Sequence, residues 1–174
     1  MDSYSFYKSL YDRELTRRIN LDNAISLPIT VLTIIVASNS YALKDQSIIY
    51  NVTDFKPRHL ILVVLLIVLF MAIFYIMRSF NNLFKGFAYK NFAYVSDIVK
   101  YEKQIEEYNN TVTNERKIDF SQIIILKLAG LTDDHIIFND KRSKDLQKAR
   151  TYLIVSLILT ALNFIPLIIN YIRL

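Results

Sequence analysis

Two groups of basic side chains are the residues whose types and positions point most directly to a chemical task. Each group precedes a long apolar run, and clustered positive charge there attracts phosphate, either on anionic lipid headgroups or on a nucleotide or oligonucleotide. Headgroup attraction is the more common reason for such a cluster. We expect the two groups to form a cytoplasmic basic mouth that binds an anionic ligand. Its residues are Arg13, Arg17, Arg18, Arg142, Lys148 and Arg150.

Residues 133–150, before the last apolar run, have the spacing of a charged helix. His135, Asn139, Arg142, Leu146 and Arg150 share one helical face, where the two arginines have no acidic partner. Carboxylates and lysines elsewhere on this helix are three or four residues apart, so they are expected to pair along it. The expected pairs are Asp140 with Lys144, Lys141 with Asp145, and Asp145 with Lys148.

Polar residues within two of the apolar runs also recur at helical spacing. They are Ser26, Thr30, Thr33 and Ser40 in the first run, and Ser156, Thr160, Asn163 and Asn170 in the last. Small and hydroxyl residues allow helices to approach closely, and amides form hydrogen bonds between helices. The same stripes are also suited to line a water-filled pathway between subunits. The sequence leaves both interpretations open and predicts a kink at Pro166.

Residues for catalysis or for metal binding are scarce. The chain has 174 residues, two histidines, two glycines and no cysteine, and it lacks nucleotide-binding loops and hydrolase or metalloprotease motifs. Its grouped carboxylates, Glu102, Glu106 and Glu107, alternate with lysines in the manner of a solvated helix face. We therefore expect neither an enzyme nor a protein that carries a metal or another cofactor.

The elements that must position these residues are apolar helices. Three runs without charge are about as long as the roughly 20 residues that a helix needs to cross a bilayer. We predict transmembrane helices at residues 23–43, 59–78 and 151–172. The fold class expected is therefore an all-α integral membrane protein, with a helical cytoplasmic bundle continuous with the spans.

The distribution of lysine and arginine predicts the orientation of the spans. Residues 79–150 and the N-terminal amphipathic helix, residues 1–22, are rich in basic residues and are expected in the cytoplasm. The loop 44–58 and the C-terminus are expected outside. Within 79–150 the pattern predicts a long helix, kinked near Gly86, then a turn at 109–114 and a short helix that ends at Gly130. A last helix is expected to begin at Thr132 and to continue into the third span.

The chain resembles a known family along most of its length. The stretches "YDRELTRRINLDNAISLPITVLTIIVA", "YVSDIVKYEKQIEEYN" and "HIIFNDKRSKDLQKARTYLIVSLILTAL" are similar to membrane effectors of bacterial anti-phage systems encoded beside nucleotidyltransferases, of the Hailong type. More distant relatives are two-span effectors of the SLATT kind, which lack the late third span. The resemblance implies a tetrameric ion channel in the bacterial inner membrane. It also implies regulation by single-stranded DNA that the partner nucleotidyltransferase makes.

The sequence and this resemblance together lead to one expected function and two alternatives. We expect an oligomeric channel that an anionic ligand, a single-stranded DNA oligomer or a nucleotide, gates through the cytoplasmic region, and that depolarises the membrane when it is open. One alternative is a holin-like pore former, although holins have shorter cytoplasmic parts. The other is a non-conducting membrane scaffold for a soluble partner.

Overall fold

The structure is a computed structural model that describes residues 2–43 and 57–172, with side chains for residues 2–41 and 59–165. The elements in this part are all α-helices or 3-10 helices, and no strand occurs among the described residues. The predicted all-α class is therefore confirmed. Three helical stretches are long and apolar enough to cross a membrane: Ser3–Tyr41, His59–Asn81 and Asn114–Ile165. The predicted loop 44–58 falls almost entirely outside the described residues.

The chain divides into two compact units. Unit 1 comprises Met1–Asn20 and Phe87–Asp140, and unit 2 comprises Leu21–Gly86 and Lys141–Leu174. Each unit is therefore built from segments that are far apart in the sequence.

Two helices, α1 (Ser3–Asn23) and α2 (Ser26–Leu43), follow each other with a short turn at Ala24 and Ile25. Pro28 explains the turn, because proline has no N–H to donate and its ring clashes with the carbonyl one turn earlier. The Ser26 hydroxyl donates to the Asn23 carbonyl at 2.9 Å, which satisfies one of the carbonyls at the end of α1.

The third helix, α3 (Pro57–Asn81), ends in a left-handed turn. Asn82, Leu83 and Phe84 have φ values of 44°, 54° and 73°, and Gly86 has a φ of 71°. Residues with a Cβ rarely adopt this backbone conformation, and the conformational free energy is lowest at Gly86, which has none. The backbone N–H of Gly86 donates to the Asn81 carbonyl at 3.1 Å, which closes the turn.

Residues 87–94 are not helical, so the predicted long helix with a kink near Gly86 is wrong. The left-handed turn ends α3 completely, and a new helix, α4 (Val95–Thr111), begins only after Tyr94. Two contacts in unit 1 hold the intervening segment in its irregular conformation: the Tyr89 hydroxyl binds Asn139, and the Lys90 carbonyl binds His135. These tertiary contacts override the helical spacing of the apolar residues.

The loop after α4 confirms only part of the turn predicted at 109–114, because α4 continues to Thr111 and the loop begins at Val112. It contains the 3-10 helix η2 (Asn114–Arg116). The Asn109 side chain bridges the loop, since its amide oxygen accepts from the Ile118 N–H at 2.8 Å and its amide nitrogen donates to the Ile118 carbonyl at 2.9 Å. Asp119 then caps the next helix by accepting a hydrogen bond from the Ser121 N–H at 2.9 Å.

The last helix, α5 (Phe120–Ile172), has 53 residues without a break and contributes to both units. The predicted end at Gly130 and the predicted start at Thr132 are therefore wrong. A single glycine costs a helix only about 1 kcal/mol relative to alanine. Leu128 and Leu131, on either side of Gly130, are buried, and the Thr132 hydroxyl donates to the Leu128 carbonyl of the same helix at 2.8 Å. Packing of this face outweighs the cost of the glycine.

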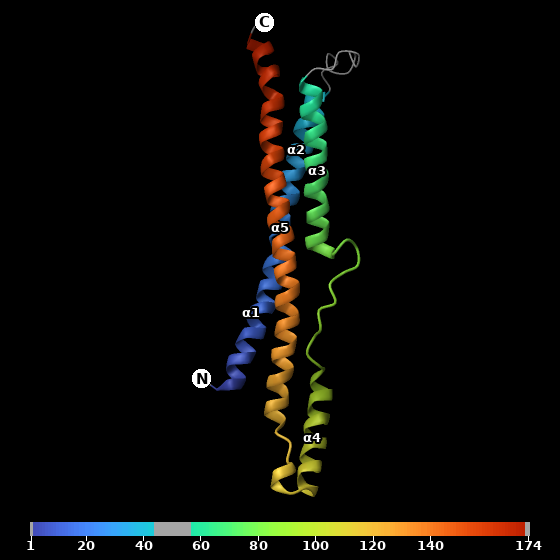
Figure 1. Cartoon of the computed structure of the whole chain (residues 1–174), viewed down its shortest axis with the longest axis vertical. Helices are drawn as coiled ribbons and strands as arrows, with labels where there is room; N and C mark the ends of the chain where they lie inside the picture. The colour runs from blue at the N-terminus through green and yellow to red at the C-terminus, as the bar shows by residue number, and fades with distance from the viewer. Residues whose placement is uncertain (1, 44–56, 173–174) are drawn as a thin grey trace. The chain divides into compact units, whose positions relative to one another are not determined.

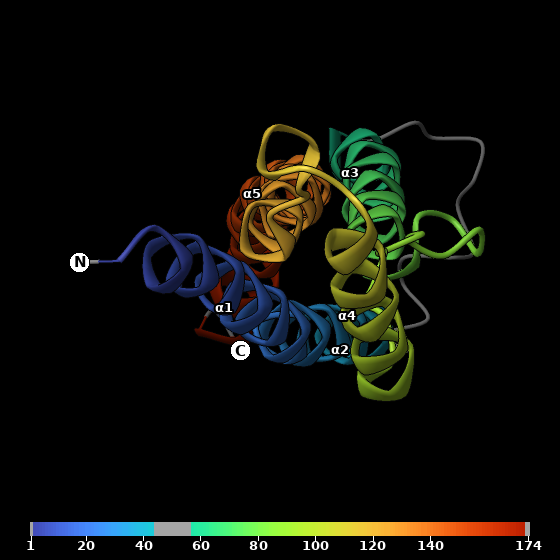
Figure 2. The same ribbon diagram turned by 90° about the horizontal axis from the view of Figure 1, so that it is seen from below.

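In unit 2, α2, α3 and the later part of α5 run side by side (Figure 1). Viewed along their axes, the three helices stand at the corners of a triangle (Figure 2). Apolar side chains from all three fill the space between them, among them Ile35 from α2, Leu65 and Ala72 from α3, and Leu153 from α5. The space between these three helices of unit 2 is thus a packed apolar core.

Candidate functional site

The six residues of the expected basic mouth divide equally between the units. Arg13, Arg17 and Arg18 belong to unit 1, and Arg142, Lys148 and Arg150 belong to unit 2. Each set is therefore described within its own unit.

In unit 1, all three arginines contact other side chains. Arg17 forms an ion pair with Asp140 of α5 at 2.6 Å and lies 3.4 Å from Glu14. Arg18 lies over the Tyr89 ring, 4.3 Å from its centroid, and Arg13 is 3.4 Å from Glu14 while remaining largely exposed. Arg13 is consequently the residue of this set with the most accessible guanidinium.

The Arg17–Asp140 pair also affects protonation. The hydrogen bond from Arg17 to Asp140 raises the pKa of the guanidinium above its ordinary value, against a smaller opposing effect of burial. An arginine already stays charged at any ordinary pH, so this increase in pKa does not change the charge of Arg17.

In unit 2, Arg142 is only 2% exposed and joins three helices. Its guanidinium pairs with Asp22 of α1 and donates to the Ser79 carbonyl of α3 at 2.9 Å, and the Ser79 hydroxyl donates back to the Arg142 carbonyl at 2.9 Å. A side chain with these contacts fixes helices together and is not available to a ligand. Arg142 is therefore removed from the basic mouth.

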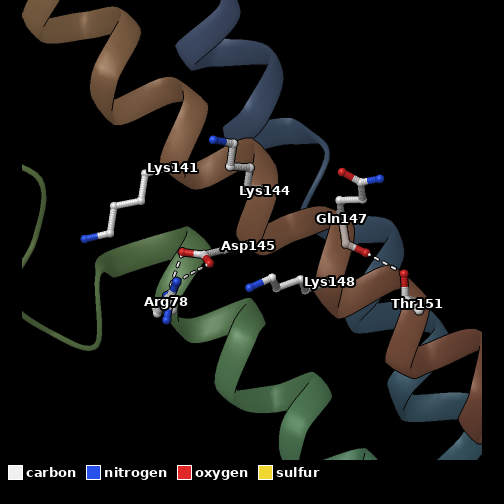
Figure 3. Close-up of a pocket in the computed structure, with 7 residues that line it drawn as sticks. All are labelled: Arg78, Lys141, Lys144, Asp145, Gln147, Lys148 and Thr151. Carbon is white, nitrogen blue, oxygen red and sulfur yellow. Dashed lines mark hydrogen bonds and ion pairs between the residues drawn. The ribbon is translucent and has the colours of Figure 1, made fainter.

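Lys148 and Arg150 remain on the surface of unit 2. Lys148 lies over the Tyr75 ring, with its ammonium 5.2 Å from the ring centroid. It also lines a cavity of about 380 Å³ beside the end of α3. Figure 3 shows this cavity, with the Arg78 guanidinium facing the Asp145 carboxylate and Lys148 extending toward them.

The ion pairs expected along the charged part of α5 do not form. Asp140 pairs with Arg17, Asp145 pairs with Arg78 at 2.7 Å, and the Lys141 ammonium donates to the Asn82 side chain at 3.2 Å. The acidic residues instead bind cations on other helices of their own unit. The almost fully buried Asp145 carboxylate explains the preference, because a two-pronged guanidinium satisfies both of its oxygens at once.

The two polar stripes have opposite environments. Ser156, Thr160 and Asn163 on α5 are buried against the other helices of unit 2, so this stripe packs between helices of one chain. Thr30 and Thr33 on α2 are exposed, and each hydroxyl donates to a carbonyl of its own helix, at 3.1 Å and 3.0 Å. The side chain of Asn170 lies outside the described side chains, and α5 continues as a helix through Pro166 to Ile172, so the expected kink at Pro166 stays a prediction.

Asn39 completes the buried stripe, and sequence reasoning missed it. Its side-chain amide donates to the Thr160 hydroxyl at 2.9 Å and to the Ile35 carbonyl at 2.8 Å, and its oxygen accepts from Asn163 at 3.4 Å. The available signal was its spacing from the apolar residues Ile25, Leu32 and Ile35, which places Asn39 on their face of the helix.

Unit 1 contains a second buried polar network that the sequence did not reveal. The Asn139 amide donates to the Glu14 carbonyl at 2.9 Å and to its carboxylate at 3.1 Å, and its oxygen accepts from the Tyr89 hydroxyl at 2.9 Å. His135 lies nearby, with Nε2 3.1 Å from the Lys90 carbonyl. Since a carbonyl can only accept, Nε2 carries a proton, and the buried Nδ1 has no hydrogen-bond partner.

No group of three or more potential metal-ligating side chains occurs among the described residues. Comparison with protein-family models, with curated proteins and with solved structures finds no match to this chain. The functional argument therefore depends on the arrangement of its own residues.

Proposed function

We propose that the chain is an integral membrane protein whose α2, α3 and later α5 segments span a bilayer. Support comes from the three apolar helices and from the outward-facing apolar side chains of unit 2. Leu27, Leu66 and Ile158, for example, are all more than half exposed. Lipid would cover this apolar surface. The basic segments are placed in the cytoplasm, with the N-terminus inside and the C-terminus outside, in a bacterial inner membrane.

We further propose that several copies assemble into an ion channel. The observation that supports it best is the exposed polar face of α2, formed by Ser26, Thr30, Thr33 and Ser40 on an otherwise apolar helix. The Thr30 and Thr33 hydroxyls each donate to their own helix but retain acceptor capacity, so this face tolerates lipid yet is also suited to water. No described residue of the same chain buries these four side chains.

The packed centre of unit 2 favours an oligomer over a pore through one chain. Ile35, Leu65 and Ala72 are almost fully buried between the helices. The Thr160 hydroxyl and the Asn163 amide of the α5 stripe both bind Asn39 of α2. A water-filled path is therefore proposed between chains, lined by the α2 faces. The family resemblance favours four copies.

The ligand is proposed to be anionic, a single-stranded DNA oligomer or a nucleotide from a partner nucleotidyltransferase, and opening would depolarise the membrane. Arg13, Lys148 and Arg150 are the members of the basic mouth with the most accessible charge. A ligand can shift gating only through different affinities for the closed and open states. Charge removal at Arg13 in unit 1 and at Arg150 in unit 2 is therefore tested separately, and a variant that removes a ligand contact should alter the ligand's effect on conductance while leaving membrane insertion intact.

The test is ion flux through liposomes that contain purified protein. The double variant Thr30→Val, Thr33→Val keeps the side-chain shapes and removes two hydroxyls, and we expect a severalfold loss of flux. Thr16→Val is the matched control, because Thr16 makes the same bond to its own helix but lies outside the apolar segments. Unchanged flux in the double variant would remove the α2 face from the pore. The absence of flux from inserted wild-type protein would remove the channel.

A membrane scaffold is the second candidate, and a groove in unit 1 favours it. Phe92, Ile98, Tyr101, Ile123 and Ile124 line an apolar cavity of about 380 Å³ between α4 and α5. A scaffold would bind a partner protein through this groove even if the chain conducts no ions. A pull-down of the wild-type chain from cells, with the groove variant Ile98→Asp as the control, tests for this partner and so distinguishes a scaffold from a channel.

A further inference from the structure

We propose that the cavity between α3 and α5 in unit 2 binds a phosphate group at the membrane surface. The inference rests on the proposed placement of α3 and α5 in a membrane. The cavity shares Lys148 with the proposed basic mouth, but the inference does not require that the chain conducts ions. The phosphate could belong to an anionic lipid headgroup or to a soluble molecule, and the chemistry of recognition is the same for both.

Charge is the first argument. The cavity of about 380 Å³ is lined by four basic side chains and one acidic side chain, an excess of three positive charges. Asp145 is already bound to Arg78 by two contacts, at 2.8 Å and 2.7 Å, as Figure 3 shows. The pair therefore leaves the charge of the three lysines, Lys141, Lys144 and Lys148, without compensation.

The contacts of the lysines are the second argument. None of the three forms an ion pair with a described residue. Lys141 donates to the neutral Asn82 side chain, and Lys148 lies over the Tyr75 ring. Both contacts hold the ammonium groups in place without neutralising them. An anion that enters the cavity would thus meet positioned charges.

The position of the cavity in the chain is the third argument. Arg78 is the last residue of the predicted span on α3, and Thr151 is the first residue of the predicted span on α5, and both line the cavity. These are the points at which the helices would leave the hydrocarbon and reach the level of the headgroups. Basic pockets between transmembrane helices on the cytoplasmic side commonly bind lipid phosphates.

The experiment measures binding to the full chain in uncharged detergent by isothermal titration calorimetry. The probes are dioctanoyl phosphatidylglycerol and inorganic pyrophosphate. The test variant is Lys141→Gln, Lys144→Gln, Lys148→Gln, which leaves the Arg78–Asp145 pair intact. The control is Lys100→Gln, Lys103→Gln, Lys117→Gln, which removes three exposed lysines from unit 1 and so changes the net charge equally. Circular dichroism establishes that each variant is folded.

We expect the test variant to bind at least one probe about tenfold more weakly than wild type, since each lysine contributes to phosphate attraction at such a surface, and the control to bind as wild type does. Loss of phosphatidylglycerol binding alone identifies a headgroup site, and loss of pyrophosphate binding identifies a site for a soluble phosphate. Equal binding by wild type and the test variant, or no binding of either probe to wild type, overturns the proposal.

A separate measurement keeps this proposal distinct from the proposed function. Flotation with phosphatidylcholine liposomes tests whether the chain enters a membrane at all. A protein that fails to float would refute the membrane placement and with it the headgroup, while the pyrophosphate titration would still decide whether the cavity binds phosphate.

Discussion

Both units bury an asparagine network, but the partners of the asparagines differ. In unit 1, Asn139 binds the carboxylate of Glu14, which also contacts Arg17. In unit 2, Asn39 binds the Thr160 hydroxyl and the Asn163 amide, so its side-chain partners are all neutral. Moving a charge away from water costs far more than moving a hydrogen-bonded neutral group. This difference is the one expected if unit 1 is surrounded by water and the apolar helices of unit 2 are surrounded by lipid.

Charged pairs in unit 2 lie outside its apolar segments. Arg78 with Asp145, and Arg142 with Asp22, join helices beyond the ends of the apolar runs. The same unit thus uses neutral hydrogen bonds within the runs and ion pairs at their ends. This change along the helices indicates where a bilayer surface would lie.

The largest expected effect comes from Arg142, which joins α1, α3 and α5. Arg142→Met should lower the free energy of unfolding by about 3 kcal/mol, because it removes the hydrogen bonds of the buried guanidinium to both Asp22 and the Ser79 carbonyl. Unfolding in mixed detergent, followed by circular dichroism, measures the change. Arg150→Met, at an exposed position, is the control. Equal stability of the two variants would contradict the bracing role of Arg142.

Asn139→Leu should lower stability by about 2 kcal/mol, with the effect confined to unit 1. The substitution removes the hydrogen bond that Asn139 donates to the buried Glu14 carboxylate and the one that it accepts from the Tyr89 hydroxyl, so that Glu14 keeps only its 3.4 Å contacts with arginines of α1. Hydrogen exchange should become faster in residues 3–20 of α1 and remain unchanged in α3. Asn110→Leu, on the exposed surface of α4, is the control. Equal protection of α1 in both variants would show that the network does not hold α1 in place.

Asn39→Leu should have a smaller effect, about 1 kcal/mol, since hydrogen bonds between transmembrane helices contribute little on average. The same measurement in detergent tests it. In a double-mutant cycle with Thr160→Val, the two effects should not add, because the 2.9 Å hydrogen bond between these side chains is shared. Additive effects would mean that the two residues act separately and that the neutral network is not a unit.

The apolar segments were predictable because their composition alone decides them. A run such as residues 60–77 has no polar face, so only a helix in an apolar environment accommodates it. The environment of each stripe was not predictable. Thr30 on α2 and Thr160 on α5 have the same helical spacing in the sequence, yet one is exposed and the other buried. The spacing of polar residues identifies the helix face that they share, but it does not say whether that face packs against another helix or remains exposed.

The charged residues show the same limit. The i, i+4 rule considers only one helix, and it paired Asp145 with lysines of α5. In the structure Asp145 pairs with Arg78 of α3 instead. A guanidinium can bind both oxygens of a buried carboxylate, so this pair is more stable than a pair with an exposed lysine. Arg142 was expected to contact a ligand, but its guanidinium binds Asp22 of α1 and the Ser79 carbonyl of α3, so it links helices instead.

The exposed face of α2 should show the smallest effect on stability. Thr30→Val, Thr33→Val should change the free energy of unfolding by less than about 0.5 kcal/mol, because both hydroxyls bind only their own helix. Ser156→Val, at a fully buried position of α5, is the contrasting variant and should destabilise through overpacking. A large loss of stability from the α2 variant in its assembled form, absent from the isolated chain, would mean that the α2 face packs against another copy. The stripe would then hold the assembly together, and the pore would have to be sought on another face.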